Sequence, residues 1–262
     1  MAMKIEETLN LGEEGIVPGK TNTFITICLG NKFFSDKTSI HEEIIDEYLE
    51  WAFKYTKDKV LFLIADKIQN TNYIVRNKNT TEWVNRRKVY YEGDRIEASL
   101  RKYVEKLPKE KQNKIRVIRW DEYERNDPDV CETTRLVYQE FKNNPEFRSK
   151  ILDMVKSEVK DRKFKEEDYL KLCDYVLDEF PLCYHGLQYR GEEYRLSFYP
   201  QPDSVAYFLE RIQNGEIFPK LKKRLSDNQV SWVILNEGQE RLNIYYDFFH
   251  NTKSNKKQKL NE

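Results

Sequence analysis

The sequence predicts an α/β domain with a Rossmann-like, mostly parallel sheet flanked by helices. Two observations carry this prediction. Short runs of apolar and β-branched residues, which suit strands, alternate along the chain with longer segments that have the apolar spacing of helices. Residues 60–65 are apolar without interruption, which is typical of a parallel strand covered on both faces. A chain of 262 residues can bury one full core, so a single domain is the simplest organisation.

The expected elements follow one another in the order of such a sheet. Strands are expected over residues 24–28, 60–65, 115–119 and 194–199, and helices over 38–55, 81–107, 133–142, 146–160 and 166–179. Gly93 and Asp94 are expected to divide the second helix into two, and Pro181 to mark the end of the last one. Residues 230–235 and 241–246 flank a turn sequence and predict a β-hairpin.

The two ends of the chain differ in composition from the middle. Glycine and proline recur in residues 1–20, which predicts a flexible arm, and the Lys/Asn-rich residues 250–262 predict a disordered tail. Residues 21–249 are then the single folded domain. We expect neither a membrane span nor a signal peptide, because the apolar runs are short and the N-terminus is acidic. The four scattered cysteines form no CxxC pair, which favours a reducing, cytoplasmic environment.

The first expected strand ends in a cysteine at a sharp turn. Cys28 is followed two residues later by Gly30 and then by Asn31, and both of these residue types tolerate a positive φ. A helix is expected soon after the turn. Strand, sharp turn and helix form the geometry of a nucleophile elbow, which normally carries serine. The alternative is that Cys28 is one more small apolar core residue.

A phenol and a carboxylate share one face of the last expected helix. Tyr175 and Glu179 are four residues apart, so they are neighbours on the helix surface. Such a pair can handle protons if partial burial raises the pKa of the carboxyl group. The alternative is a solvated glutamate beside a core tyrosine.

Basic residues recur along the expected helix over 81–107. The net charge of the whole chain is zero, so the chain can contact nucleic acid only through a local basic patch. One cationic stripe suits a phosphate backbone, and it contains Lys88, Arg95, Lys102 and Lys106, with Arg101 beside it. Glutamates are interleaved with these residues, so an ordinary salt-bridged surface is the alternative.

The sequence lacks the motifs of several cofactor-dependent enzymes. Neither GxxxxGK[ST] nor GxGxxG occurs, so a bound nucleotide cofactor is not supported. The histidines and cysteines do not have a metal-ligand spacing, and no histidine has the signature of a catalytic triad. We therefore expect neither a cofactor nor a metal.

Taken together, residues 24–207 resemble the cyclodipeptide synthases. That family has a Rossmann-like domain related to the catalytic domains of class I tyrosyl- and tryptophanyl-tRNA synthetases, without their ATP-using motifs. The matching segments are Ile27-Cys28-Leu29-Gly30-Asn31-Lys32-Phe33-Phe34-Ser35, Glu50-Trp51-Ala52, Ala65-Asp66-Lys67, Arg119-Trp120-Asp121, Tyr175-Val-Leu-Asp-Glu179-Phe-Pro181-Leu182 and Tyr199-Pro200. The family's nucleophilic serine is here Cys28, whose thiol can also accept an acyl group and form a thioester.

The resemblance implies that two aminoacyl-tRNAs are joined into a cyclic dipeptide, a 2,5-diketopiperazine. It implies catalytic roles for Cys28, Tyr175, Glu179 and Tyr199. It also implies substrate contacts by Phe24, Thr26 and Leu182 for the first amino acid and by Gly30, Asn31 and Pro200 around the turn and the second pocket. The basic residues of the helix over 81–107 would then hold tRNA. Two other function classes stay open: a different thiol-dependent acyltransferase, and a non-catalytic tRNA-binding module. The oligomeric state is not predicted.

Overall fold

The computed structural model describes residues 4–9, 15–29, 40–159, 164–199, 211–212, 214–222 and 230–236. Its strands are β1 (Lys4–Leu9), β2 (Asn22–Cys28), β3 (Val60–Ala65), β4 (Ile115–Arg119), β5 (Leu187–Tyr189), β6 (Glu192–Tyr199) and β7 (Ser231–Asn236). Its helices are α1 (Glu42–Tyr55), the 3-10 turn η1 (Lys67–Gln69), α2 (Asn70–Arg76), α3 (Glu82–Lys106), α4 (Lys109–Lys114), α5 (Trp120–Asn126), α6 (Val130–Asn143), α7 (Pro145–Glu158), α8 (Glu166–His185) and α10 (Pro219–Lys222).

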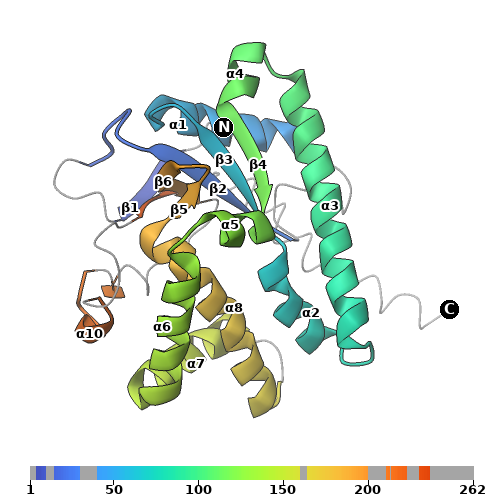
Figure 1. Cartoon of the computed structure of the whole chain (residues 1–262), viewed down its shortest axis with the longest axis vertical. Helices are drawn as coiled ribbons and strands as arrows, with labels where there is room; N and C mark the ends of the chain where they lie inside the picture. The colour runs from blue at the N-terminus through green and yellow to red at the C-terminus, as the bar shows by residue number, and fades with distance from the viewer. Residues whose placement is uncertain are drawn as a thin grey trace, which may run out of the picture.

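The described residues form one seven-stranded sheet in the order β1-β7-β6-β2-β3-β4, with β5 paired to β6 (Figure 1). Strands β7, β6, β2, β3 and β4 are parallel, whereas β1 and β5 pair antiparallel. The predicted α/β class with a mostly parallel sheet is therefore confirmed. Every residue of β3 is buried, as expected for a strand covered on both faces.

Strand β2 divides the core into two halves because its side chains alternate between the two faces of the sheet. Ile25 and Ile27 belong to the half that contains residues of α1 and α3. Phe24 and Cys28 lie against the other half, which contains residues of α6, α7 and α8. This alternation turns the last side chain of the strand, that of Cys28, toward α8.

Helix α3 runs without a break through Gly93, so the expected division at Gly93 and Asp94 is wrong. Its start agrees with the prediction, since the Thr81 side chain accepts a hydrogen bond from the Val84 backbone N–H. Gly93 is buried, and a Cβ atom placed there would lie 2.5 Å from the Arg119 guanidinium. The glycine is therefore present for close packing, and it does not end the helix.

Helix α8 continues past Pro181 to His185, so the expected end near Pro181 is also wrong. A proline inside a helix costs about 3 kcal/mol because it loses one hydrogen bond and crowds the previous turn. Here residues 180–185 are all buried, and their packing offsets that cost. The helix ends instead at Gly186, whose φ of 72° is a conformation that suits glycine.

The expected flexible arm over residues 1–20 is wrong for Lys4–Leu9, which form β1 and pair antiparallel with β7. No local pattern reveals this pairing, because its partner strand lies at the other end of the sequence. The predicted hairpin is also wrong, since β7 pairs with β1 on one edge and β6 on the other. Residues 241–246 and 250–262 lie outside the described residues. No helix in the described part is long and apolar enough to cross a membrane.

Candidate active site

The order of the strands marks one edge of the sheet as a binding site. From β2 the chain moves outward through β3 and β4, then returns to the other side of β2 with β6 and β7. Open α/β sheets bind ligands at the carboxyl ends of the strands where the order reverses. Here that point lies between β2 and β6. Their pairing stops at Phe24 and Ser197, so residues 25–28 of β2 form no ladder with β6.

The nucleophile candidate lies at this point. Cys28 is the last residue of β2 and is half-buried. Its Sγ atom lies 4.0 Å from the phenolic oxygen of Tyr175 on α8, and either group is able to donate a hydrogen bond. The fold thus brings together two of the predicted residues that are 147 positions apart in the sequence.

Glu179 lies one helical turn beyond Tyr175 on α8 and is only 2% exposed. Buried carboxyl groups are uncommon, and they occur where a partner or a function requires them. The alternative of a solvated glutamate is therefore wrong.

The residues predicted near the first substrate lie on the same side of the sheet as Cys28. Phe24 is fully buried and packs edge-on against Trp232, with 6.3 Å between the ring centroids. Leu182 is buried on α8 in the same half of the core. Thr26 and Ser197 are buried, and their hydroxyl groups have no hydrogen-bond partner in the described part of the chain.

Four predicted site residues are described incompletely or not at all. Gly30, Asn31 and Pro200 lie outside the described residues. For Tyr199 the structure gives the backbone, which ends β6 beside the same edge of the sheet.

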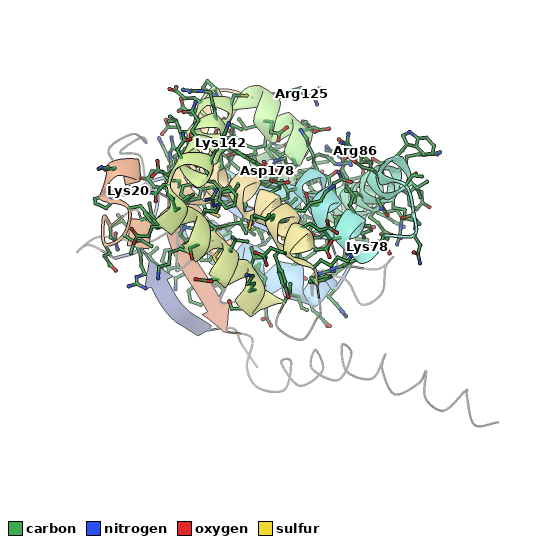
Figure 2. The ribbon with its side chains drawn as sticks, turned by 90° about the horizontal axis from the view of Figure 1, so that it is seen from below. Lys20, Lys78, Arg86, Arg125, Lys142 and Asp178 are labelled. Atoms are coloured by element: carbon green, nitrogen blue, oxygen red, sulfur yellow. The ribbon has the colours of Figure 1, made fainter. Side chains whose placement is uncertain are left out.

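A carboxyl pair next to Glu179 was not predicted. The Tyr138 hydroxyl on α6 donates to Asp178 at 3.1 Å and lies 3.4 Å from Asp174. Burial raises the pKa of Asp178 to about 6 and also raises that of Asp174. The four-residue spacing of Asp174 and Asp178 on the expected helix was the signal that placed both carboxyl groups on one face. Asp178 lies near the middle of the face seen from below in Figure 2.

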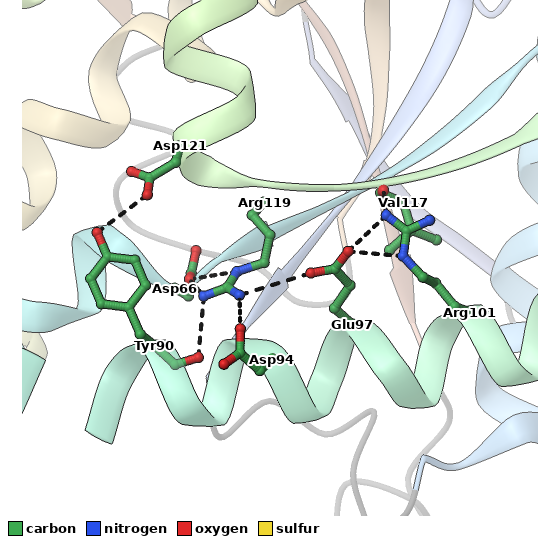
Figure 3. A network of polar contacts seen from close by, with 8 residues as sticks. All are labelled: Asp66, Tyr90, Asp94, Glu97, Arg101, Val117, Arg119 and Asp121. Atoms are coloured by element: carbon green, nitrogen blue, oxygen red, sulfur yellow. Dashed lines mark hydrogen bonds and ion pairs between the residues drawn. The ribbon is translucent and has the colours of Figure 1, made fainter. Parts of the chain in front are cut away.

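The predicted basic stripe on α3 is partly a salt-bridged surface. Arg95 is paired with Glu92 at 3.2 Å, Arg101 with Glu97 at 2.7 Å and Lys106 with Glu42 at 2.5 Å. Arg101 also donates to the Val117 carbonyl of β4 at 2.9 Å (Figure 3). Lys88 and Lys102 are exposed and have no ion pair within the described part of the chain. They are the cations of the stripe that are most available to RNA.

An ionic network fixes α3 to the carboxyl edge of the sheet. Arg119, which ends β4, donates through Nε to Asp66 at 2.8 Å and also bonds to Asp94 (Figure 3). Its Nη2 donates to the Tyr90 carbonyl at 3.2 Å. Asp66 directly follows β3 and is 1% exposed. Asp66 directly follows one expected strand and Arg119 ends the next, and the carboxyl ends of parallel strands meet at one edge, so the sequence contained a signal for this contact.

A family model described as cyclodipeptide synthase matches residues 15–235. The chain belongs to the cyclodipeptide synthase family. Members of this family are tRNA-dependent aminoacyltransferases that make cyclic dipeptides, and the match decides between the function classes that the sequence left open. No protein with a curated description matches this cyclodipeptide synthase in sequence.

Solved structures share the fold. A cyclodipeptide synthase from Bacillus thermoamylovorans is 21% identical, with a TM-score of 0.65 over 89% of this chain and 96% of its own. A Mycobacterium tuberculosis protein, described as demonstrating that cyclodipeptide synthetases are related to type I tRNA synthetases, is 17% identical, with a TM-score of 0.59 over 84% and 86%. A cyclodipeptide synthase from Candidatus Glomeribacter gigasporarum, bound to Phe-tRNAPhe, is 17% identical, with a TM-score of 0.53 over 87% and 91%.

Proposed function

We propose that this cyclodipeptide synthase holds both of its acyl intermediates on Cys28 as thioesters. The observation that carries the proposal is the position of the thiol, at the end of β2 and 4.0 Å from the Tyr175 hydroxyl. A thiolate is an effective nucleophile toward esters, and thioesters react readily with amines.

In the first step, the Cys28 sulfur attacks the ester carbonyl of the first aminoacyl-tRNA. A C–S bond forms and the C–O bond to the tRNA ribose breaks. The ribose oxygen leaves with the proton that the Cys28 thiol gives up, so that the enzyme carries an aminoacyl thioester. Tyr175 and Glu179 hold the ammonium group of the bound amino acid.

In the second step, the amine of the bound amino acid attacks the ester of the second aminoacyl-tRNA. A peptide bond forms, the second tRNA leaves, and Glu179 moves the proton from the amine to the leaving ribose oxygen. In the last step, the new terminal amine attacks the thioester, an amide C–N bond forms and the C–S bond breaks. The proton that the amine loses passes to the leaving sulfur, which restores the Cys28 thiol. The tether gives this amine a high effective concentration. Tyr199 positions the reacting groups or relays the proton.

The pocket assignments rest on where the remaining site residues lie in the sequence relative to the matching motifs. We assign the first amino acid to Phe24, Thr26 and Leu182, which lie on the α8 side of the sheet. We assign the second to Asn31 and Pro200, and Gly30 to the turn that the sequence predicts after Cys28; this assignment rests on the sequence resemblance. Both activated esters are supplied by tRNA, so no step here needs ATP or a metal.

We further propose that the acceptor arm of tRNA binds along α3, through Lys88, Arg95, Arg101, Lys102 and Lys106. Lysine and arginine neutralise phosphates without reading bases, so this contact depends on salt more than on sequence. The related enzyme solved in complex with Phe-tRNAPhe supports tRNA as the carrier. Because charged tRNAs are made in the cytoplasm and none of the four cysteines forms a disulfide, we assign the enzyme to that compartment.

The test is to label the enzyme with radioactive aminoacyl-tRNA and to treat the labelled protein with neutral hydroxylamine, which cleaves thioesters much faster than oxygen esters. Label on the parent should be released, whereas Cys28→Ala should carry no label and form no cyclic dipeptide. Cys28→Ser should carry label that resists hydroxylamine. Cys131→Ser changes an exposed cysteine elsewhere and should behave as the parent. Persistent labelling of Cys28→Ala would overturn the proposal.

A further inference from the structure

We propose that Trp83, Arg87 and Tyr91 on α3 form a docking surface for the acceptor end of tRNA, in which the two aromatic rings stack on exposed base faces. We call these three residues the aromatic stripe. The inference rests on the proposed function, in which aminoacyl-tRNA is the substrate. It adds an aromatic contact that lies outside the basic residues assigned to RNA above.

The three residues lie on one face of α3. They are spaced four apart, so each lies about one turn from the next on the helix surface. Val89, Gly93 and Ile96 mark the buried face of the same helix, on the opposite side. Trp83 is 63% exposed and Tyr91 is 64% exposed. Large exposed aromatic side chains that gather on one surface typically mark a binding site.

The charges beside the rings select the kind of partner. The Arg87 guanidinium lies 4.7 Å from the centroid of the Trp83 ring. Neither Arg87 nor Lys88 has an ion pair within the described part of the chain, in contrast to Arg95 and Arg101 further along the helix. Unpaired cations next to exposed aromatic rings suit a polyanion that also presents flat rings, which is the chemistry of a nucleic acid.

The stripe lies at the edge of the sheet where the reaction takes place. Gly93 packs against Asp66 at the carboxyl end of β3, and the residues of α3 before it extend beyond that edge beside α2 (Figure 1). At 1.5 Å per residue, Trp83 lies about 15 Å along the helix from Gly93. Arg86, next to the stripe, is on the same face of the molecule as Asp178 of α8 (Figure 2).

The position of the aromatic stripe near the carboxyl edge of the sheet indicates which part of the tRNA binds to it. The acyl ester is carried only by the acceptor end of tRNA, and this end must reach Cys28 at the carboxyl edge of β2. Bases within a duplex are already stacked on each other. Exposed base faces occur where the acceptor duplex stops and the unpaired 3′ segment begins, so these are the faces available to Trp83 and Tyr91.

The experiment measures binding of an uncharged acceptor-arm hairpin with an unpaired 3′ end to the full chain, by fluorescence anisotropy. Trp83→Ala and Tyr91→Ala should each weaken binding by roughly 5- to 100-fold without changing its salt dependence, because stacking releases no counterions. Trp83→Phe and Tyr91→Phe should restore most of the affinity. Arg87→Ala should weaken binding and lower the slope of log K against log salt by about one.

Two control variants remove side chains that are exposed, like those of the aromatic stripe, but lie elsewhere on the surface. Leu170→Ala removes an exposed apolar side chain from α8, and Lys57→Ala removes an exposed cation at the amino edge of the sheet. Both should bind the hairpin as the parent does. Circular dichroism should show that every variant is folded.

Equal hairpin binding by the parent, Trp83→Ala and Tyr91→Ala would overturn the inference, as would no binding by the parent. Loss of self-association in the alanine variants, with RNA binding unchanged, would instead identify a second copy of the chain as the occupant. Failure of the proposed function would be seen in a different assay, the labelling of Cys28 by aminoacyl-tRNA. Binding of the uncharged hairpin does not depend on Cys28, so Cys28→Ala should bind it as the parent does.

Discussion

Replacement of Gly93 by alanine tests how α3 is fixed to the sheet. At an ordinary position inside a helix, glycine to alanine stabilises a protein by about 1 kcal/mol. At Gly93 the new Cβ would lie 2.5 Å from Arg119 Nη2 and 2.6 Å from Asp66 Oδ2. These distances are too short for any Cβ contact, so the methyl group must push the guanidinium away from its carboxylate.

The size of the effect follows from the burial of that pair. The Arg119 side chain is 13% exposed and that of Asp66 is 1% exposed. Breaking a buried ion pair costs about 3–5 kcal/mol because it leaves a charge in the protein interior without its partner. Subtracting the gain in helix propensity, we expect Gly93→Ala to lower the free energy of unfolding by about 2–4 kcal/mol.

Urea denaturation of four proteins checks this reasoning as a double-mutant cycle. The four are the parent, Gly93→Ala, the pair Asp66→Ala with Arg119→Ala, and all three changes together. With the ion pair removed the methyl group has room, so Gly93→Ala should then be neutral or stabilise by up to about 1 kcal/mol. A stabilising effect of Gly93→Ala in the parent would refute the argument.

Three further predictions concern α8 and β2. Glu179→Gln should lower the rate of product formation at least ~100-fold, measured by mass spectrometry, since a general base is lost while folding is retained. Burial raises the pKa of Asp178 to about 6 from its usual value near 4, so the charged carboxylate destabilises the folded state. This loss in the free energy of unfolding is absent below about pH 4 and complete above about pH 6. Thermal melts should therefore show Asp178→Asn to be more stable than the parent above pH 6, with no difference at pH 4. Thr26→Val should change which cyclic dipeptides form from a mixture of charged tRNAs, whereas Thr23→Val, which removes an equally buried hydroxyl on the opposite face of β2, should leave the product ratio unchanged.

The central part of the fold could be predicted because periodicity alone determines it. The uninterrupted apolar run of β3 and the β-favouring residues of β2 indicate two buried strands, and turn residues indicate where β2 ends. Spacing also indicated candidate residues, whereas their roles were implied only by the resemblance to the cyclodipeptide synthases. Cys28 ends a strand, and Tyr175 and Glu179 are one turn apart on a helix, so each position follows from spacing over a few residues.

Features that depend on contacts between distant elements could not be predicted in this way. The helical spacing of α3 shows which residues share a face, but it does not show that Lys106 meets Glu42 of α1 or that Arg101 meets Val117 of β4. The two breaks expected at Gly93 and Pro181 failed for a related reason. Propensity describes the isolated helix, whereas buried packing decides whether it continues.

The carboxyl end of β3 joins the two functional halves of the enzyme. Ala65 pairs with Cys28 in the sheet register and packs in the half of the core that contains α8. The next residue, Asp66, turns to the opposite face and holds Arg119 against α3. The candidate catalytic groups on α8 and the surface of α3 that we propose for RNA are therefore connected through two consecutive residues at one buried strand end. If RNA binds along α3 as proposed, the sheet would set the distance between the RNA and the thiol, and the ion pair of Asp66 with Arg119 would hold α3 at that distance.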